Sequence, residues 1–190
     1  RSRVALLIAF GDAGPFGLYT ALTAWLPSFY FETHGLSLTT AGTMLGILPL
    51  MGVIVVPAAA VFSMHFIRRK PVFIVSSILV GTAGFGTFLL AGTWAVYPAL
   101  ILVGIGCWLY LPSLMTLPME LPNVRPEEVA VIFAVMMVIS GGVTFLAPFI
   151  VGVMTDMLGS YIPGFTVFAI SAWSLLLAGI FLPEPNRQPA

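Results

Sequence analysis

The chain has 190 residues, of which 59% are hydrophobic and only 7% are charged, and its mean hydropathy is +1.09. A soluble domain carries roughly 25% charged residues, so this composition excludes a soluble enzyme, a nucleic-acid binder and a disordered segment. Seven basic and seven acidic residues give a formal net charge of zero, and the single cysteine, Cys107, leaves no disulfide framework within the chain.

Six apolar runs follow one another along the chain, each long enough to cross roughly 30 Å of hydrocarbon with about 20 residues. They are Val4–Phe31, Thr39–Phe66, Val72–Gly92, Trp94–Leu117, Val129–Met154 and Tyr161–Leu182, here named spans one to six. The runs are continuously apolar and lack the alternation of barrel strands. The sequence therefore predicts an all-α membrane protein in which residues 1–190 form a single bundle of six transmembrane helices.

The basic residues predict the orientation of this bundle in the membrane. With a cytoplasmic N-terminus, all seven Lys and Arg residues fall on the cytoplasmic side, and three of them, Arg68, Arg69 and Lys70, form a basic loop between spans two and three. We therefore expect a multi-pass protein of the cell membrane with both termini in the cytoplasm. The chain begins without methionine directly before span one, which suggests a piece of a longer protein.

A faint internal repeat relates the first three spans to the last three. Trp25-Leu26-Pro27-Ser28 near the end of span one matches Tyr110-Leu111-Pro112-Ser113 near the end of span four. Because three spans are an odd number, two consecutive triplets must be inverted relative to each other in the membrane. Chance is the alternative interpretation, since the shared motif is short and proline is abundant.

Prolines divide the spans into two groups. Spans one, two, four and five carry prolines inside them or near their ends, whereas spans three and six have no interior proline. A proline within a helix leaves backbone groups that only neighbouring protein or water can satisfy. This asymmetry suggests four helices shaped for a cavity or for movement and two outer supports, although kinks that serve packing alone explain it equally well.

Asp12 is the one acidic residue well inside a span, and a carboxylate there is costly enough to suggest function. Two interpretations remain open. Asp12 caps a helix that starts near Ala13, or span one continues through it despite the nearby glycines and proline. If the helix continues, Asp12, Phe16, Tyr19 and Thr23 share one face, which suits a solute pathway better than lipid. A carboxylate there could also exchange a coupling proton.

Further candidates for the solute pathway lie in spans four and five. Trp108 and Tyr110 in span four have polar tips that need partners when they are buried. Ser140 and Thr144, four residues apart in span five, could bind a solute. The alternatives are packing for the aromatic residues and hydrogen bonds to their own helix for the two hydroxyls.

Several kinds of chemistry find no support in the sequence. The two histidines are near span ends on opposite sides of the membrane, so they predict no shared metal site. No catalytic pair, phosphate-binding loop or voltage-sensing arginine series is present, so we expect no enzyme activity and no cofactor.

Taken together, these features resemble one half of a major facilitator superfamily transporter. The basic loop stretch Ser63-Met64-His65-Phe66-Ile67-Arg68-Arg69-Lys70 is similar to the family's Gly-x-x-x-Asp-Arg-x-Gly-Arg-Arg/Lys pattern, with Met64 in the place of Asp and Ile67 in the place of Gly. These departures put charge-linked gating at this loop in doubt. Span five, with Gly141-Gly142, Pro148 and Gly152, resembles the family's eleventh helix.

The start and end of the chain indicate which half this is. Gly17-Leu18-Tyr19, Trp25-Leu26-Pro27 and His34-Gly35-Leu36-Ser37 resemble the seventh helix of cyanate permease-like members, and Leu182-Pro183-Glu184 resembles the exit of a twelfth helix. The resemblance implies the C-terminal half of a twelve-helix fold with an inverted three-plus-three repeat. It also implies that spans one, two, four and five face the central cavity.

The function that this resemblance implies is secondary transport, as in a permease or symporter, of small organic solutes by alternating access. We expect anionic solutes, with the lipid bilayer, a coupling proton and a missing N-terminal six-helix half as the partners, and no nucleic acid. The alternative is a six-helix membrane protein that binds a partner or lipid without transporting anything.

Overall fold

The computed structural model describes residues 2–65, 69–120 and 125–182. Within these ranges the regular structure is helical throughout. The helices are α1 (Ser2–His34), α2 (Leu38–Leu45), α3 (Ile47–His65), α4 (Lys70–Leu89), α5 (Val96–Leu109), α6 (Leu111–Glu120), α7 (Pro126–Leu158), α8 (Ile162–Ser171) and α9 (Ser174–Phe181).

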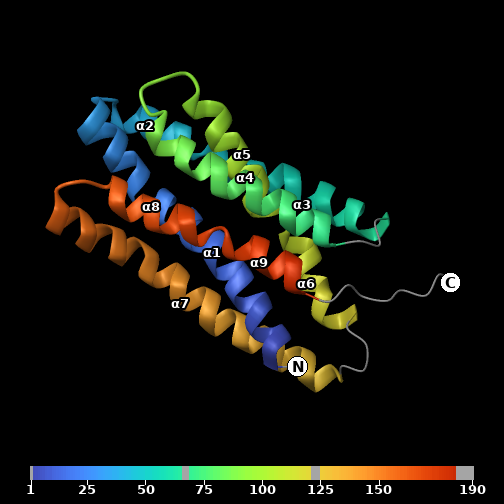
Figure 1. The fold of residues 1–190 in the computed structure, drawn as a ribbon. Coiled ribbons are helices and arrows are strands. Elements are labelled where there is room, and N and C mark those ends of the chain that lie inside the picture. Colours follow the sequence, from blue (N-terminus) through green and yellow to red (C-terminus); the bar gives the residue numbers. More distant parts are fainter. Residues whose placement is uncertain (1, 66–68, 121–124, 183–190) are drawn as a thin grey trace.

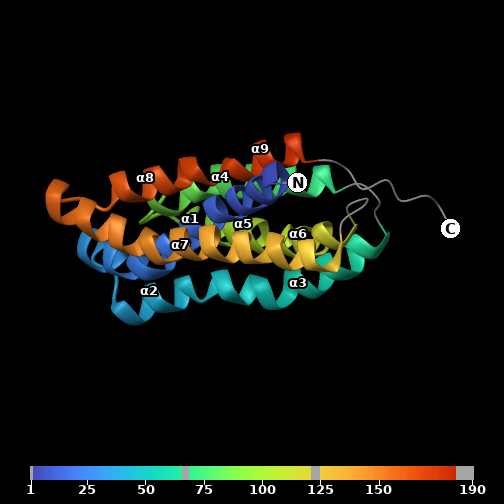
Figure 2. The ribbon, with the colours of Figure 1, turned by 90° about the horizontal axis from the view of Figure 1, so that it is seen from below.

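Six candidate membrane spans are built from these helices, as the sequence predicts. They are Arg3–His34, Leu38–Phe62, Lys70–Leu89, Val96–Glu120, Pro126–Leu158 and Ile162–Phe181. Most predicted boundaries lie within four residues of the observed ones, because each span is limited by the polar residues between the apolar runs. The protein is therefore a multi-pass membrane protein of the all-α class. Figure 2 shows the start of α1 and the ends of α3, α6 and α9 toward one end of the bundle.

The helix breaks do not follow the prolines. Span two is interrupted near Gly46 and span four at Tyr110, each shortly before a proline. However, α1 passes through Pro15 and Pro27 without interruption, and α7 passes through Pro148. The expectation that the glycines and proline near Asp12 could interrupt span one is therefore wrong.

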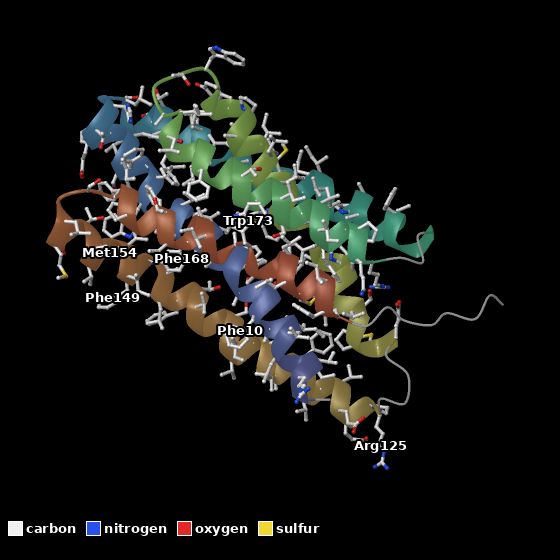
Figure 3. The ribbon with its side chains drawn as sticks, in the orientation of Figure 1. Phe10, Arg125, Phe149, Met154, Phe168 and Trp173 are labelled. Carbon is white, nitrogen blue, oxygen red and sulfur yellow. The ribbon has the colours of Figure 1, made fainter. Side chains whose placement is uncertain are left out.

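Span six breaks between α8 and α9 although it has no interior proline. The indole of Trp173 lies against Gly81 of α4, where an added Cβ would come within 2.6 Å of it (Figure 3). The backbone N–H of Trp173 donates to the Ile170 carbonyl, three residues earlier in the chain. The Ala172 carbonyl accepts a hydrogen bond from the Ser77 hydroxyl of α4. A local turn and one hydrogen bond from span three thus satisfy the backbone at the break between α8 and α9.

The contacts between spans follow the three-plus-three repeat. Span one packs against spans five and six, and span four packs in the same way against spans two and three. Exchanging the first triplet for the second leaves these pairs unchanged, and spans three and six also pack against each other. In Figure 1, α1 and α7 run side by side, as do α4 and α5.

Two tryptophans make the same contact in the two triplets. Trp108 Nε1 of span four donates to the Leu48 carbonyl of span two at 3.2 Å, and Trp25 Nε1 of span one donates to the Pro148 carbonyl of span five at 2.7 Å. In both cases a glycine stands four residues after the accepting residue, and a Cβ there would come 2.8 or 2.9 Å from the indole. These glycines let each indole reach a backbone carbonyl inside the bundle.

Glycines on α1 bring it close to span six. A Cβ on Gly11 would lie 2.6 Å from the Ala178 side chain, and one on Gly14 would meet the Ser171 backbone. Small residues allow such close packing of helices in lipid, where van der Waals contact stabilises association. The glycines around Asp12 therefore serve packing, and the helix continues.

Two apolar clusters lie toward opposite ends of α1. One includes Ile8 and Ala9 together with Leu114 of α6, and the other includes Leu18 and Leu22. The stretch of α1 between the two clusters carries Asp12. The fold thus places a carboxylate where α1 is surrounded by other spans and separated from both ends of the bundle by apolar packing.

Candidate functional site

Asp12 is the centre of the candidate site. It lies inside the continuous helix α1, nine residues after Arg3 and so roughly 14 Å along the helix axis. The interpretation of Asp12 as a helix cap is therefore wrong. The residue is only 4% exposed, so its carboxylate has almost no access to water within this chain.

Two hydroxyl groups donate hydrogen bonds to this carboxylate. Tyr110 OH donates to Asp12 Oδ1 at 3.0 Å, and Ser140 Oγ donates to Asp12 Oδ2 at 2.5 Å. Tyr110 stands at the break between α5 and α6, and Ser140 lies in the middle of α7. Both residues are buried. Spans one, four and five thus meet at one polar point, and three of the residues singled out in the sequence are brought together.

The Asp12 carboxylate is held by neutral donors. Among the described residues, Arg69 and Glu120 form an ion pair. No described Lys, Arg or His side chain lies within ion-pair distance of Asp12. The nearby thiol of Cys107 is buried and points to the Pro15 carbonyl, with 3.9 Å between Sγ and O. A buried carboxylate with hydrogen bonds but no cation can change charge without breaking an ion pair.

An aromatic cluster lies beside the carboxylate. The ring centroids of Phe16 and Tyr19 are 6.0 Å apart, and Trp108 packs edge-on against both rings at 5.8 and 5.6 Å. The three side chains are half-buried. Phe16 and Tyr19 follow Asp12 on the same face of α1, as the spacing in the sequence predicts, and Trp108 comes from span four.

Two of the singled-out hydroxyls lie outside these contacts. Thr23 Oγ1 donates to the Thr20 carbonyl of its own helix at 3.1 Å. Thr144 is half-buried on α7, one turn beyond Ser140. A role for either residue in a solute pathway stays a prediction.

The basic loop is tied to the end of span four. Arg68 lies outside the described residues. Arg69 is buried, and its guanidinium donates to the Ser113 carbonyl at 2.5 Å, to the Thr116 hydroxyl and to Glu120 Oε1 at 2.5 Å. Lys70 Nζ donates to the Ile180 carbonyl near the end of α9 at 3.1 Å.

Glu120 was not singled out in the sequence analysis. An acidic residue at the end of span four, on the same side as a cluster of three basic residues, is the signal that could have identified it. Its pairing with Arg69 places an ion pair at this end of the bundle even though Met64 stands where the family pattern has aspartate.

A third carboxylate accepts a hydrogen bond at the opposite end of the bundle. Tyr161 OH, just before α8, donates to Glu32 Oε2 at 2.9 Å. Burial, followed by this hydrogen bond, raises the pKa of the Tyr161 phenol to about 12. In the described parts of the chain, no group of three or more His, Cys, Asp or Glu side chains could hold a metal ion.

Comparison with known proteins relates the chain to a described family and to a named transporter. Residues 1–148 match the sequence profile of the family described as Major Facilitator Superfamily. The cyanate transport protein CynX of Escherichia coli (strain K12) is 29% identical over 168 residues, which are 85% of this chain and 41% of that protein. The chain thus spans less than half the length of this curated relative.

Proposed function

Because the chain belongs to the major facilitator superfamily, we propose that it forms the C-terminal six-helix half of a secondary transporter of small organic solutes that works by alternating access. The observation that carries this proposal is the buried Asp12 carboxylate. It accepts hydrogen bonds from Tyr110 and Ser140, beside an aromatic cluster at the meeting point of spans one, four and five. Such a carboxylate inside a membrane bundle is costly to keep and so suits solute binding or ion coupling.

The uncovered spans support a missing second half. Spans two and five are the least covered, with 17% of their most apolar windows buried against 44% or more in the other four. Val53 on α3 and Val138 on α7 are more than 70% exposed, and Phe149 points away from the bundle (Figure 3). The chain also spans 41% of the relative's length. An N-terminal six-helix half would cover these faces and complete the solute cavity.

We propose small anions as the solutes. The support is the relative, whose name describes cyanate transport. An ionised Asp12 would repel an anion, and no described cation lies near enough to compensate it. Binding of an anion beside Asp12 therefore favours the protonated carboxyl, so the solute and a proton would enter together as in a symporter.

The Asp12→Asn variant of the complete transporter tests this function. Asparagine keeps the volume and one acceptor oxygen but cannot take up a proton. In proteoliposomes we expect accumulation of cyanate driven by a proton gradient to fall at least tenfold. Exchange between cyanate pools on the two sides should persist, because exchange needs no net proton movement. Normal accumulation by the variant from pH 5 to pH 8 would contradict the proposal.

The orientation with both termini in the cytoplasm is also proposed, on the distribution of the seven basic residues. In a variant without Cys107, a cysteine at exposed Thr33 should react with an impermeant thiol reagent added outside the cell. A cysteine at exposed Glu127 should react only from the cytoplasmic side. The reverse pattern of labelling would invert the orientation.

A further inference from the structure

The two oxygens of the Asp12 carboxylate have different partners. Oδ1 accepts from Tyr110 at 3.0 Å, and Oδ2 accepts from Ser140 at the shorter distance of 2.5 Å. Both donors point at an acceptor that carries a negative charge, so the arrangement fits the ionised form. When the carboxyl gains a proton, the oxygen that carries it becomes a donor and needs an acceptor of its own.

Tyr110 is poorly suited to provide that acceptor. Its side chain is 0% exposed, and its hydroxyl has Asp12 as its hydrogen-bond partner in the structure. If the phenol accepted from Asp12, its own hydrogen would lose that partner in a buried site, which is unfavourable. The proton is therefore disfavoured on Oδ1.

Ser140 has an alternative partner for its hydrogen. In the middle of a helix a serine hydroxyl can donate to the carbonyl four residues earlier, which on α7 is that of Met136. With its hydrogen turned to that carbonyl, the Ser140 oxygen is free to accept from Oδ2. All the polar groups around the neutral carboxyl then keep a partner.

We propose that Ser140 is the positioning residue for the coupling proton, which Asp12 carries on Oδ2. This inference rests on the proposed function, in which Asp12 takes up and releases a proton. In the step, one O–H bond forms on Oδ2 with a proton from water, and the charge of Asp12 changes from −1 to zero. Ser140 keeps its own proton and turns from donor to acceptor, while Tyr110 continues to donate to Oδ1.

The surroundings of Asp12 leave this step to Ser140. Two titratable side chains of span four face this region, Tyr110, which donates to Asp12, and Cys107, whose thiol points to the Pro15 carbonyl. The elements α8 and α9 contain no charged residue, and the charged residues of α7 and α4 lie near the ends of those helices. Around this part of α1, span six presents Ala178, Leu175 and two serines.

The position of Ser140 also gives the proton a direction of approach. The next two residues on α7, Gly141 and Gly142, have nothing within 4 Å of the place where a Cβ would stand. Their neighbour Phe145 is 80% exposed. The side of α7 beside Ser140 is thus not covered by the described part of this chain, and in the complete transporter the proton would reach Oδ2 from the cavity on this side.

The test uses serine variants of the complete transporter in proteoliposomes. Ser140→Ala should reduce cyanate accumulation driven by a proton gradient at least tenfold, and it should reduce exchange between cyanate pools much less than accumulation. Ser140→Thr restores a hydroxyl that can also donate to the Met136 carbonyl, so it should recover accumulation. Ser76→Ala is the matched control, because Ser76 is fully buried and its hydroxyl has no hydrogen-bond partner among the described residues.

Infrared difference spectra between acidic and neutral pH provide a readout that is independent of transport. The band of the protonated Asp12 carboxyl, identified by its loss in Asp12→Asn, should change position in Ser140→Ala because Oδ2–H loses its acceptor. It should be unchanged in Ser76→Ala.

The outcomes separate the two proposals. Absence of an Asp12 band, or normal accumulation in Asp12→Asn, would overturn the proposed function and this inference with it. A normal Asp12 band that is unchanged in Ser140→Ala, or undiminished accumulation in that variant, would overturn the role of Ser140 alone. Failure of Ser140→Thr to recover accumulation would also count against it, since that variant retains the hydroxyl.

Discussion

Two carboxylates of this bundle, the buried Asp12 and the half-buried Glu120, are held by different kinds of donor. Asp12 accepts from the neutral hydroxyls of Tyr110 and Ser140 in the interior of the bundle. Glu120, at the end of span four, accepts from the guanidinium of Arg69 at 2.5 Å. Neutralising Glu120 would remove the carboxylate that pairs with the buried Arg69 guanidinium, whereas neutralising Asp12 breaks no ion pair among the described residues. This difference supports the proposal that Asp12 is the carboxylate that takes up a proton, because no ion pair has to be broken there.

Span four contributes residues to both carboxylate sites, the one around Asp12 and the one around Glu120. Tyr110 at the start of α6 contacts Asp12, and Thr116 and Glu120 further along the same helix contact Arg69. Span four therefore connects the proposed proton site at Asp12 with the ion pair of Arg69 and Glu120.

The largest effect on stability is expected from breaking the ion pair. Glu120→Gln should lower the free energy of unfolding by about 3 kcal/mol, because it removes the carboxylate that pairs with the buried guanidinium of Arg69. Asp12→Asn should change it by no more than about 1 kcal/mol, since the amide keeps a hydrogen-bond acceptor. Unfolding of the complete protein in detergent, followed by circular dichroism, measures both values.

The control for this pair is Glu127→Gln, a change at an exposed residue near the start of α7. We expect it to stay within about 0.5 kcal/mol of wild type. If Asp12→Asn proved as costly as Glu120→Gln, the contrast between a carboxylate held by neutral donors and one held in an ion pair would fail.

Substitution of two buried tyrosines should lower the free energy of unfolding by smaller and unequal amounts. Tyr110 donates to a carboxylate, and Tyr30 donates to the Thr87 carbonyl at 2.6 Å, while both side chains are at most 1% exposed. Tyr110→Phe should cost about 2 kcal/mol and Tyr30→Phe about 1 kcal/mol, because hydrogen bonds to charged groups are stronger. Equal losses in the same unfolding measurement would mean that the charge on Asp12 adds nothing to its hydrogen bond with Tyr110.

The six spans could be predicted from the sequence because each is a continuous apolar run between polar residues. Asp12, Tyr110 and Ser140 could each be singled out, since polar groups inside a span need partners. Their meeting could not be predicted, because Asp12 is 98 residues from Tyr110 and 128 from Ser140, and no local pattern fixes how each helix is rotated.

The positions of the helix breaks also could not be predicted from the sequence. Proline marks a lost backbone hydrogen bond, but neighbouring spans can compensate for it, so α1 runs through Pro15. At Trp173 the break accompanies contacts with Gly81 and Ser77 of span three, which no property of the residues in span six reveals. The sequence identifies polar groups inside the bundle that need hydrogen-bond partners. The packing between spans determines which partners these groups have.

A third carboxylate extends the comparison to the other end of the bundle. Glu32 accepts from Tyr161 at 2.9 Å, much as Asp12 accepts from Tyr110, but Glu32 is exposed. Water can replace the lost donor there. We therefore expect Tyr161→Phe to lower the free energy of unfolding by only about 0.5 kcal/mol at pH 7.

The effect of Tyr161→Phe should depend on pH in the alkaline range. Burial and the bond to Glu32 raise the pKa of the Tyr161 phenol from its ordinary value near 10 to about 12. Below pH 10 the phenol is protonated in both the folded and the unfolded chain, so its contribution to stability is constant. Between pH 10 and pH 12 the unfolded chain loses this proton more readily than the folded one, so that contribution declines as the pH rises. The stability advantage of wild type over Tyr161→Phe should therefore shrink from pH 9 to pH 11 in unfolding measurements. A constant or growing advantage would show that the phenol ionises at its ordinary pKa or below, and that the contact with Glu32 is absent in the membrane.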